Sequence, residues 1–82
     1  MNQVELLELV NKYNSIDRQT IRNNLRLLMN EKNFTSSDMV AIGYNRNTVY
    51  SWTKPNVNNI PMFEDALKLA IQFKFDITDL LK

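Results

Sequence analysis

The side chains with the most informative chemistry lie between residues 45 and 54. Arg can donate two parallel hydrogen bonds to guanine, Asn can pair in the same way with adenine, and Ser or Thr can bond to bases or phosphate. Such residues, with one Tyr and one Lys, make up the polar part of this segment: Arg46, Asn47, Thr48, Tyr50, Ser51 and Lys54. On one side of a helix they would suit the major groove of DNA. The alternative is a solvated helix surface, where Asn, Ser and Thr are common.

Two short helices joined by a tight turn are expected to position these side chains. Gly43 follows an apolar run and enters the backbone conformation that stops a helix without steric cost. Thr35 and Asp38 have the spacing of a capping box, so the first helix is expected to begin at Thr35 or Ser36. Asn45 is a favourable N-cap for the second helix.

The apolar residues of this unit have a spacing that fits two packed helices. Val49 and Trp52 lie three apart and are expected to bury against Met39 and Ile42. Gly43 precedes Trp52 by nine residues. The combination of this spacing with the polar set favours DNA binding over a merely solvated helix.

The stretch from about Thr20 to Leu81 resembles the lambda-repressor-like (XRE-type) helix-turn-helix family of phage and bacterial regulators. A second motif in the right order, from Pro61-Met62-Phe63-Glu64-Asp65-Ala66-Leu67 to Asp76-Ile77-Thr78-Asp79-Leu80-Leu81, is similar to the closing helices of that family. The resemblance implies an all-α fold, a compact five-helix domain with an added N-terminal amphipathic helix. We expect a single domain over residues 1–82, with the extra helix in 1–16, the helix-turn-helix in 34–54 and the C-terminal helices in 61–82.

The resemblance also implies roles for individual residues. The base-reading positions fall on Arg46, Asn47 and Ser51. The positions expected at the DNA backbone are Thr35, Ser36, Asn45, Thr48, Tyr50 and Lys54. The family's usual pair, an Arg in the first helix and a Glu after the recognition helix, is absent, because those places hold Leu28 or Met29 and Thr53. Pro55 replaces a Gly expected just after the recognition helix.

Composition narrows the class of protein. The 82 residues are 44% hydrophobic and 23% charged, which suits one core. With no Cys and no His, the chain has no disulfide, no thiolate nucleophile, no usual zinc ligands and no imidazole catalysis. The paired carboxylates, such as Glu64 with Asp65, sit where helix ends favour them, so we expect no enzyme activity, metal, cofactor or small-molecule ligand. No segment has the pattern of a signal peptide or membrane span, and we expect a cytoplasmic protein.

Charge is distributed unevenly along the chain. The net charge is only +1, but no acidic residue occurs between Asp38 and Glu64. Arg18, Arg22 and Arg26 recur every four residues and form a stripe along a helix, either solvated or facing phosphate.

The remaining helices are predicted from caps and apolar periodicity. A helix from Thr20 to Asn33, with Asp17 as a cap, is expected to bury Ile21, Leu25 and Leu28. Pro61 is expected to open the next helix, with a buried stripe of Phe63, Leu67, Ala70 and Ile71. Asp76 is expected to cap the last helix, which buries Ile77 and Leu80 or Leu81.

The N-terminal helix, roughly Gln3 to Tyr13, has an apolar face wider than one packing seam needs. The face can pack on its own domain, form a dimer contact or bind a partner. Two functional hypotheses follow. The first is a small Cro-like repressor, antitoxin or restriction control protein that binds double-stranded DNA as a homodimer on a near-palindromic operator. The second is an antitoxin-like or anti-repressor-like interaction module that binds a protein through the N-terminal helix.

Overall fold

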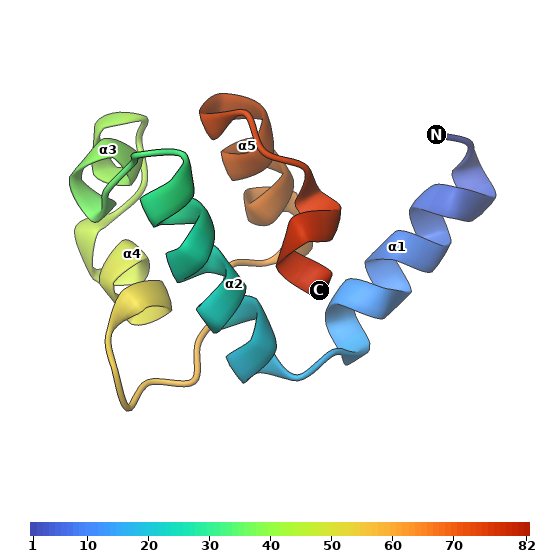
Figure 1. The fold of residues 1–82 in the computed structure, drawn as a ribbon, viewed down its shortest axis with the longest axis horizontal. Helices are drawn as coiled ribbons and strands as arrows, with labels where there is room; N and C mark the ends of the chain where they lie inside the picture. The colour runs from blue at the N-terminus through green and yellow to red at the C-terminus, as the bar shows by residue number, and fades with distance from the viewer.

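Five α-helices and one 3₁₀ helix account for the secondary structure of the chain, and the computed structural model describes all 82 residues. The elements are α1 (Gln3–Ser15), α2 (Arg18–Glu31), α3 (Ser36–Ala41), α4 (Arg46–Thr53), α5 (Phe63–Phe73) and the 3₁₀ helix η1 (Ile77–Leu81). The expected all-α class is confirmed. In Figure 1, α2 to η1 form a compact body, and α1 extends from one side with its N-terminus away from that body. No helix combines the length and apolar character needed to cross a membrane.

The core lies between α2 and the four elements that follow it. Ile21, Leu25 and Leu28 are buried on α2, as the periodicity predicted. They join one cluster with Met39 of α3 and with buried residues of α4, α5 and η1. Phe34, which precedes α3, stacks on Phe73 with ring centroids 4.1 Å apart. Because all of these elements contribute to a single cluster, the position of α4 is coupled to the whole body.

Side-chain caps set most helix starts. Asp17 caps α2, although the helix runs from Arg18 to Glu31, two residues earlier at each end than expected. The expectation for Pro61 is wrong: α5 begins at Phe63, and Pro61 lies buried just ahead of it. Met62, at the N-cap of α5, provides no side-chain cap. Pro61, with its fixed φ, therefore lies outside the first turn of α5.

The buried face of α5 differs from the predicted stripe. Ala66, Leu69 and Ala70 are buried, whereas Leu67 is partly exposed and Ile71 is 73% exposed. Positions 67 and 71 each lie one residue, or about 100° around the helix, beyond a buried alanine. The core packs on the face of α5 that carries the two alanines and Leu69, so the larger residues beside them turn outward.

Ile42 is a second correction to the predicted core. It was expected to bury against Val49 and Trp52, but it is 40% exposed. It follows the last residue of α3 as a C-cap, so its side chain leaves the face that carries Met39. Ile42 and Ile71 instead line one surface hollow of about 410 Å³.

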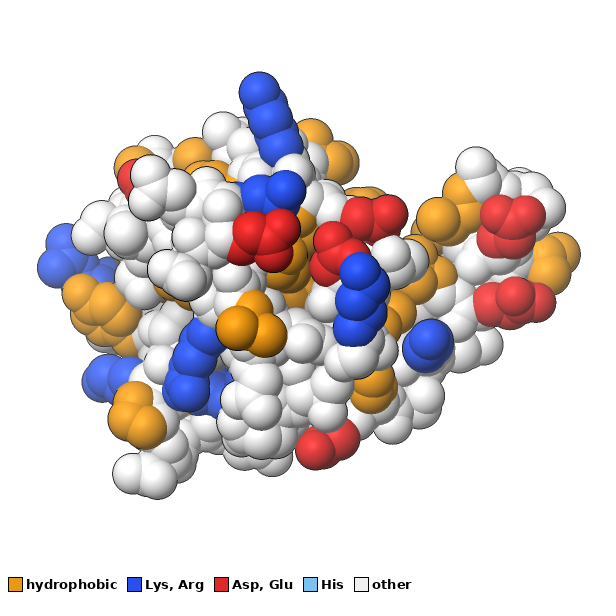
Figure 2. Space-filling view, in the orientation of Figure 1, with side chains coloured by type: hydrophobic (Ala, Val, Ile, Leu, Met, Phe, Trp, Pro, Cys, Tyr) orange, Lys and Arg blue, Asp and Glu red, His pale blue; other side chains and the backbone are white.

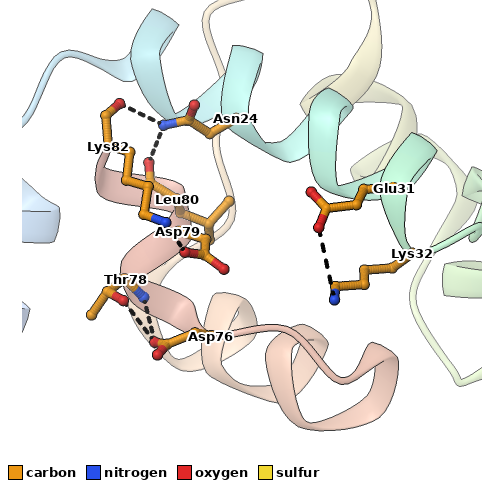
Figure 3. Close-up of polar contacts among 8 residues, drawn as sticks. All are labelled: Asn24, Glu31, Lys32, Asp76, Thr78, Asp79, Leu80 and Lys82. Carbon is orange, nitrogen blue, oxygen red and sulfur yellow. Dashed lines mark hydrogen bonds and ion pairs between the residues drawn. The ribbon is translucent and has the colours of Figure 1, made fainter.

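The C-terminal segment closes onto α2. Figure 3 shows the side chain of Asn24 between two carbonyl groups, donating to that of Leu80 at 2.8 Å and that of Lys82 at 3.0 Å. Asp76 caps the final helix as predicted, and hydrogen bonds from the backbone and hydroxyl of Thr78 hold the pKa of its carboxyl below the usual range. The helix is 3₁₀ rather than α, and Ile77, Leu80 and Leu81 are all buried.

Helix α1 is attached to the body by its C-terminal half. Tyr13 is buried, donates its hydroxyl to the carbonyl of Pro61 at 2.6 Å, and meets the Phe63 ring edge-on at 5.6 Å between centroids. Burial, with a contribution from Asp65, raises the pKa of the Tyr13 phenol. Further toward the N-terminus, Val4 is 66% exposed, and Leu6 and Leu7 are also exposed. Packing on its own chain therefore accounts for only part of the apolar face.

A buried arginine fixes the end of α4. The guanidinium of Arg22, only 1% exposed, donates to the carbonyls of Ser51 at 2.8 Å and Asn59 at 2.7 Å, and to that of Lys54. Ser51 lies in the last turn of α4, and Lys54 and Asn59 lie in the loop that follows. One side chain thus joins α2, the end of α4 and both ends of the loop. We refer to these contacts as the Arg22 clamp.

Two further arginines of α2 contact the same region. Arg18 donates to the carbonyl of Asn58 at 3.2 Å, and Arg26 donates to the carbonyl of Thr53 at 3.4 Å. The expectation of a solvated or phosphate-facing stripe is therefore wrong for Arg22, because its side chain is buried and donates to three backbone carbonyls. Arg18 and Arg26 remain exposed.

The contribution of the Arg22 clamp to stability can be tested by mutation. Arg22→Met retains much of the side-chain volume but leaves the carbonyls of Ser51, Lys54 and Asn59 without a donor. We expect the free energy of unfolding to fall by about 3 kcal/mol or more, measured by urea denaturation. Arg18→Met is the control, since it loses one exposed contact and should cost less than about 1 kcal/mol. Equal losses in the two variants would contradict the clamp.

The hydrogen bond between Tyr13 and Pro61, which attaches α1, can be tested in the same way. Tyr13→Phe removes the hydroxyl that satisfies the buried carbonyl of Pro61, and we expect a loss of about 1–3 kcal/mol in urea denaturation. Tyr50→Phe is the matched control, because the hydroxyl of Tyr50 has no protein partner. A Tyr13→Phe variant as stable as the control would show that this hydrogen bond does not hold α1.

Candidate nucleic-acid interface

The polar side chains predicted to read DNA lie together on α4. Val49 and Trp52 are buried as expected and fix which face of the helix points inward. Arg46, Asn47 and Thr48 are exposed on the first turn. Tyr50 and Ser51 are half-buried, and Lys54 is exposed just past the helix end, with its ammonium 5.8 Å from the centre of the Tyr50 ring.

Asn45 positions this face from the N-terminal end. Its side-chain oxygen accepts from the backbone N–H groups of Asn47 at 2.8 Å and Thr48 at 3.4 Å, which confirms the predicted N-cap. These N–H groups have no acceptor within the helix, so the cap stabilises the turn that carries Arg46. The oxygen of Asn45 is therefore engaged by its own helix.

The turn between α3 and α4 depends on backbone conformation and on one aromatic residue. Gly43 has a φ of 114°, which side-chain-bearing residues rarely adopt, although a Cβ there would meet no atom. Tyr44 packs edge-on against Trp52 at 5.3 Å and donates its hydroxyl to Asp65 of α5 at 3.2 Å. Burial and the nearby carboxylate of Asp65 raise the pKa of Tyr44 to about 12. Sequence reasoning missed Tyr44, which ties the turn to α5.

Helix α3 begins as predicted. Thr35 and Asp38 form the reciprocal capping box, with the Thr35 N–H donating to the Asp38 carboxylate at 2.8 Å and the Asp38 N–H to the Thr35 hydroxyl at 3.3 Å. Thr35 and Ser36 line a surface cavity of about 610 Å³ together with Arg26 and Thr53. The start of α3 and the end of α4 thus border one cavity.

Ser51 is partly committed to the protein itself. Its hydroxyl donates to the carbonyl of Thr48 at 2.6 Å and accepts from the side-chain amide of Asn59 at 2.7 Å. The Arg22 clamp holds the backbone of Asn59, so Asn59 is fixed at both its carbonyl and its side chain. Sequence reasoning placed Asn59 only in an Asn-rich loop, and no local signal pairs it with Ser51.

The electrostatic surroundings favour an anion. Every ion pair of the structure lies outside α4 and its loop: Lys32 with Glu31, Lys68 with Glu64, and Lys82 with Asp79. On the face drawn in Figure 2, acidic side chains gather over α1 and the centre, whereas the charged side chains at the lower left, over α4 and the loop, are basic and lie beside hydrophobic ones. The local charge is therefore more positive than the net charge of +1 suggests.

The N-cap can be tested by itself. Asn45→Ala removes the acceptor of two backbone N–H groups, and we expect a loss of about 1 kcal/mol in urea denaturation. Asn47→Ala is the control. It lies two residues further along with an exposed side chain and should change the free energy of unfolding by less than about 0.5 kcal/mol. Asn45→Asp should retain the cap. If the alanine variant at position 45 matched that at position 47, the cap would not stabilise α4.

Comparison of the chain with models of known protein families, with known proteins and with solved structures found no match. The contacts of α4, its turn and its loop are therefore the basis for assigning a function.

Proposed function

We propose that this protein is a sequence-specific DNA-binding regulator of the lambda-repressor-like helix-turn-helix type, which inserts α4 into the major groove. The observation that carries the proposal is the exposed polar first turn of α4, on a helix held at both ends. Asn45 caps one end and the Arg22 clamp holds the other. Side chains on a rigid element meet base edges with little loss of conformational freedom.

The chemistry of each residue suggests its role. Arg46 and Asn47 read bases, and Ser51, with one acceptor site left, supplements them. Phosphate contacts come from the remaining residues: Thr35, Ser36, Asn45, Thr48, Tyr50 and Lys54. Each good base contact contributes roughly 1–3 kcal/mol of discrimination, while the phosphate contacts supply affinity that depends on salt.

One copy of α4 spans only a few base pairs, so the proposal includes a homodimer. Two copies on half-sites about 34 Å apart would read a near-palindromic operator. A protein of this size, bound at a promoter in the cytoplasm, would repress by excluding polymerase, as a small Cro-like repressor does.

A second candidate function rests on α1. Val4 and Leu7 are more than half exposed, and the net charge is low for a DNA-binding protein. These observations favour an antitoxin-like or anti-repressor-like module that binds another protein through α1.

The test is selection of bound duplexes from a randomised DNA pool. We expect the wild type to enrich an inverted repeat and the Arg46→Ala, Asn47→Ala double variant to lose base preference, because each missing contact costs roughly 1–3 kcal/mol of discrimination. Both side chains are exposed, so the variant should fold. Lys68→Ala, a charge removed from the outer face of α5, is the control and should retain the motif.

Two outcomes would count against the proposal. An unchanged motif in the double variant would remove α4 from base reading. No enrichment by the wild type at low salt would favour the second candidate, which predicts that Val4→Asp, Leu7→Asp abolishes binding to the protein partner.

A further inference from the structure

Most of the large apolar side chains that are exposed lie on two surfaces of the molecule. The first is the N-terminal surface of α1, formed by residues 1–8. The second is the hollow between α3 and α5, together with the outer face of α5 beside it. The exposed apolar residues are Met1, Val4, Leu6 and Leu7 on the first surface, and Ile42, Leu67 and Ile71 on the second. Single exposed apolar residues are ordinary, but clusters of them indicate contact surfaces.

The N-terminal surface of α1 is apolar and acidic. Val4 and Leu7 lie three residues apart on one side of the helix and are 66% and 61% exposed. Glu5 and Glu8 are the only charged side chains of residues 1–8, and both are exposed and form no ion pair. Figure 2 shows acidic side chains beside hydrophobic ones at the N-terminal end of α1. The chain itself leaves this surface uncovered.

The hollow between α3 and α5 is apolar with a basic edge. Its lining residues are Ile42, Gly43, Tyr44, Lys68, Ile71 and Gln72. Lys68 is the only charged residue among them. Its ammonium lies 3.4 Å from the carboxylate of Glu64, but both side chains are largely exposed, and such a surface pair is weak enough to exchange partners. Leu67, one turn before Ile71, extends the apolar surface.

The two surfaces do not meet within one chain. Tyr13 fixes α1 at the start of α5, through its contacts with Pro61 and Phe63. The hollow lies instead beside the last two turns of α5, next to the turn that follows α3. In Figure 1, α1 and α3 lie on opposite sides of the body. Apolar surfaces of opposite charge are therefore left to pair between two copies of the chain.

We propose that the N-terminal surface of α1 docks in the hollow of a second copy, which docks in the same way on the first. Such a reciprocal contact closes as a two-fold dimer rather than an open chain. Packing of Val4 and Leu7 against Ile71 supplies the affinity. Glu8 beside Lys68 selects the orientation, because an exposed ion pair contributes little affinity by itself.

This dimer uses none of the polar side chains of the candidate interface, since no residue of the hollow belongs to α4. Its role in regulation rests on the proposed function, which includes a homodimer. The contact itself requires no DNA, so it can be measured separately.

The test is sedimentation equilibrium of the full chain without DNA over a range of concentrations, where we expect a reversible dimer. Leu7→Gln and Ile71→Gln should each raise the dissociation constant at least about tenfold, because the two-fold symmetry removes each apolar contact twice. Leu27→Gln changes an exposed leucine of α2 outside both surfaces, and this control should dimerise like the wild type. All three side chains are exposed, so circular dichroism should show unchanged helix content.

A mixture of Leu7→Gln with Ile71→Gln distinguishes reciprocal docking from other pairings. Their heterodimer keeps one intact contact, from the unchanged α1 of one copy to the unchanged hollow of the other, whereas either homodimer keeps none. We expect the mixture to associate more tightly than either variant alone, measured by fluorescence-detected sedimentation with one variant labelled. A mixture no tighter than its components would overturn the docking. Pairing of α1 with α1 would also overturn it, and predicts that Ile71→Gln dimerises normally.

A wild type that stays monomeric up to about 1 mM would contradict the inference as well. The selection of DNA duplexes separates this failure from that of the proposed function. A dimer that enriches no duplex supports the docking and contradicts DNA binding. A monomer that enriches a motif sensitive to Arg46→Ala, Asn47→Ala contradicts the docking and supports DNA binding.

Discussion

The geometry of α4 depends on one buried charge. Removing a guanidinium from water is costly, and Arg22 has no carboxylate to offset that cost. Burial, and to a smaller extent the charge of Arg26, lower the pKa of Arg22, but an arginine side chain stays protonated. Three backbone carbonyls replace its water. Because they belong to the end of α4 and to both ends of its loop, satisfying this charge also fixes the candidate interface.

The elements that sequence reasoning predicted are those with local causes. Asn45 and Asp76 cap helices through neighbours two or three residues away, and Gly43 ends a helix through its own φ. Each of these signals can be recognised within a stretch of a few residues. The outward position of Ile71 has no local cause, since either of two adjacent stripes on α5 satisfies the apolar period. Only the tertiary packing of the chain, which buries Ala66 and Ala70, decides between them.

The candidate interface also contains some features with local causes and others that depend on distant parts of the chain. The exposure of Arg46 and Asn47 follows from the burial of Val49 and Trp52, which the spacing predicted. The contact of Ser51 with Asn59 joins residues eight apart through a loop, and no periodic pattern encodes it. Arg22 was equally hidden, because arginines are rarely buried.

The attachment of α1 has a consequence for how the molecule opens. A helix of 13 residues is marginally stable in water without tertiary contacts, and only the C-terminal half of α1 has them. Its first turns can therefore unwind while the core around α2 stays intact. The chain consequently has two levels of stability, a body that unfolds as a unit and a terminal segment whose amide protons exchange through local fraying.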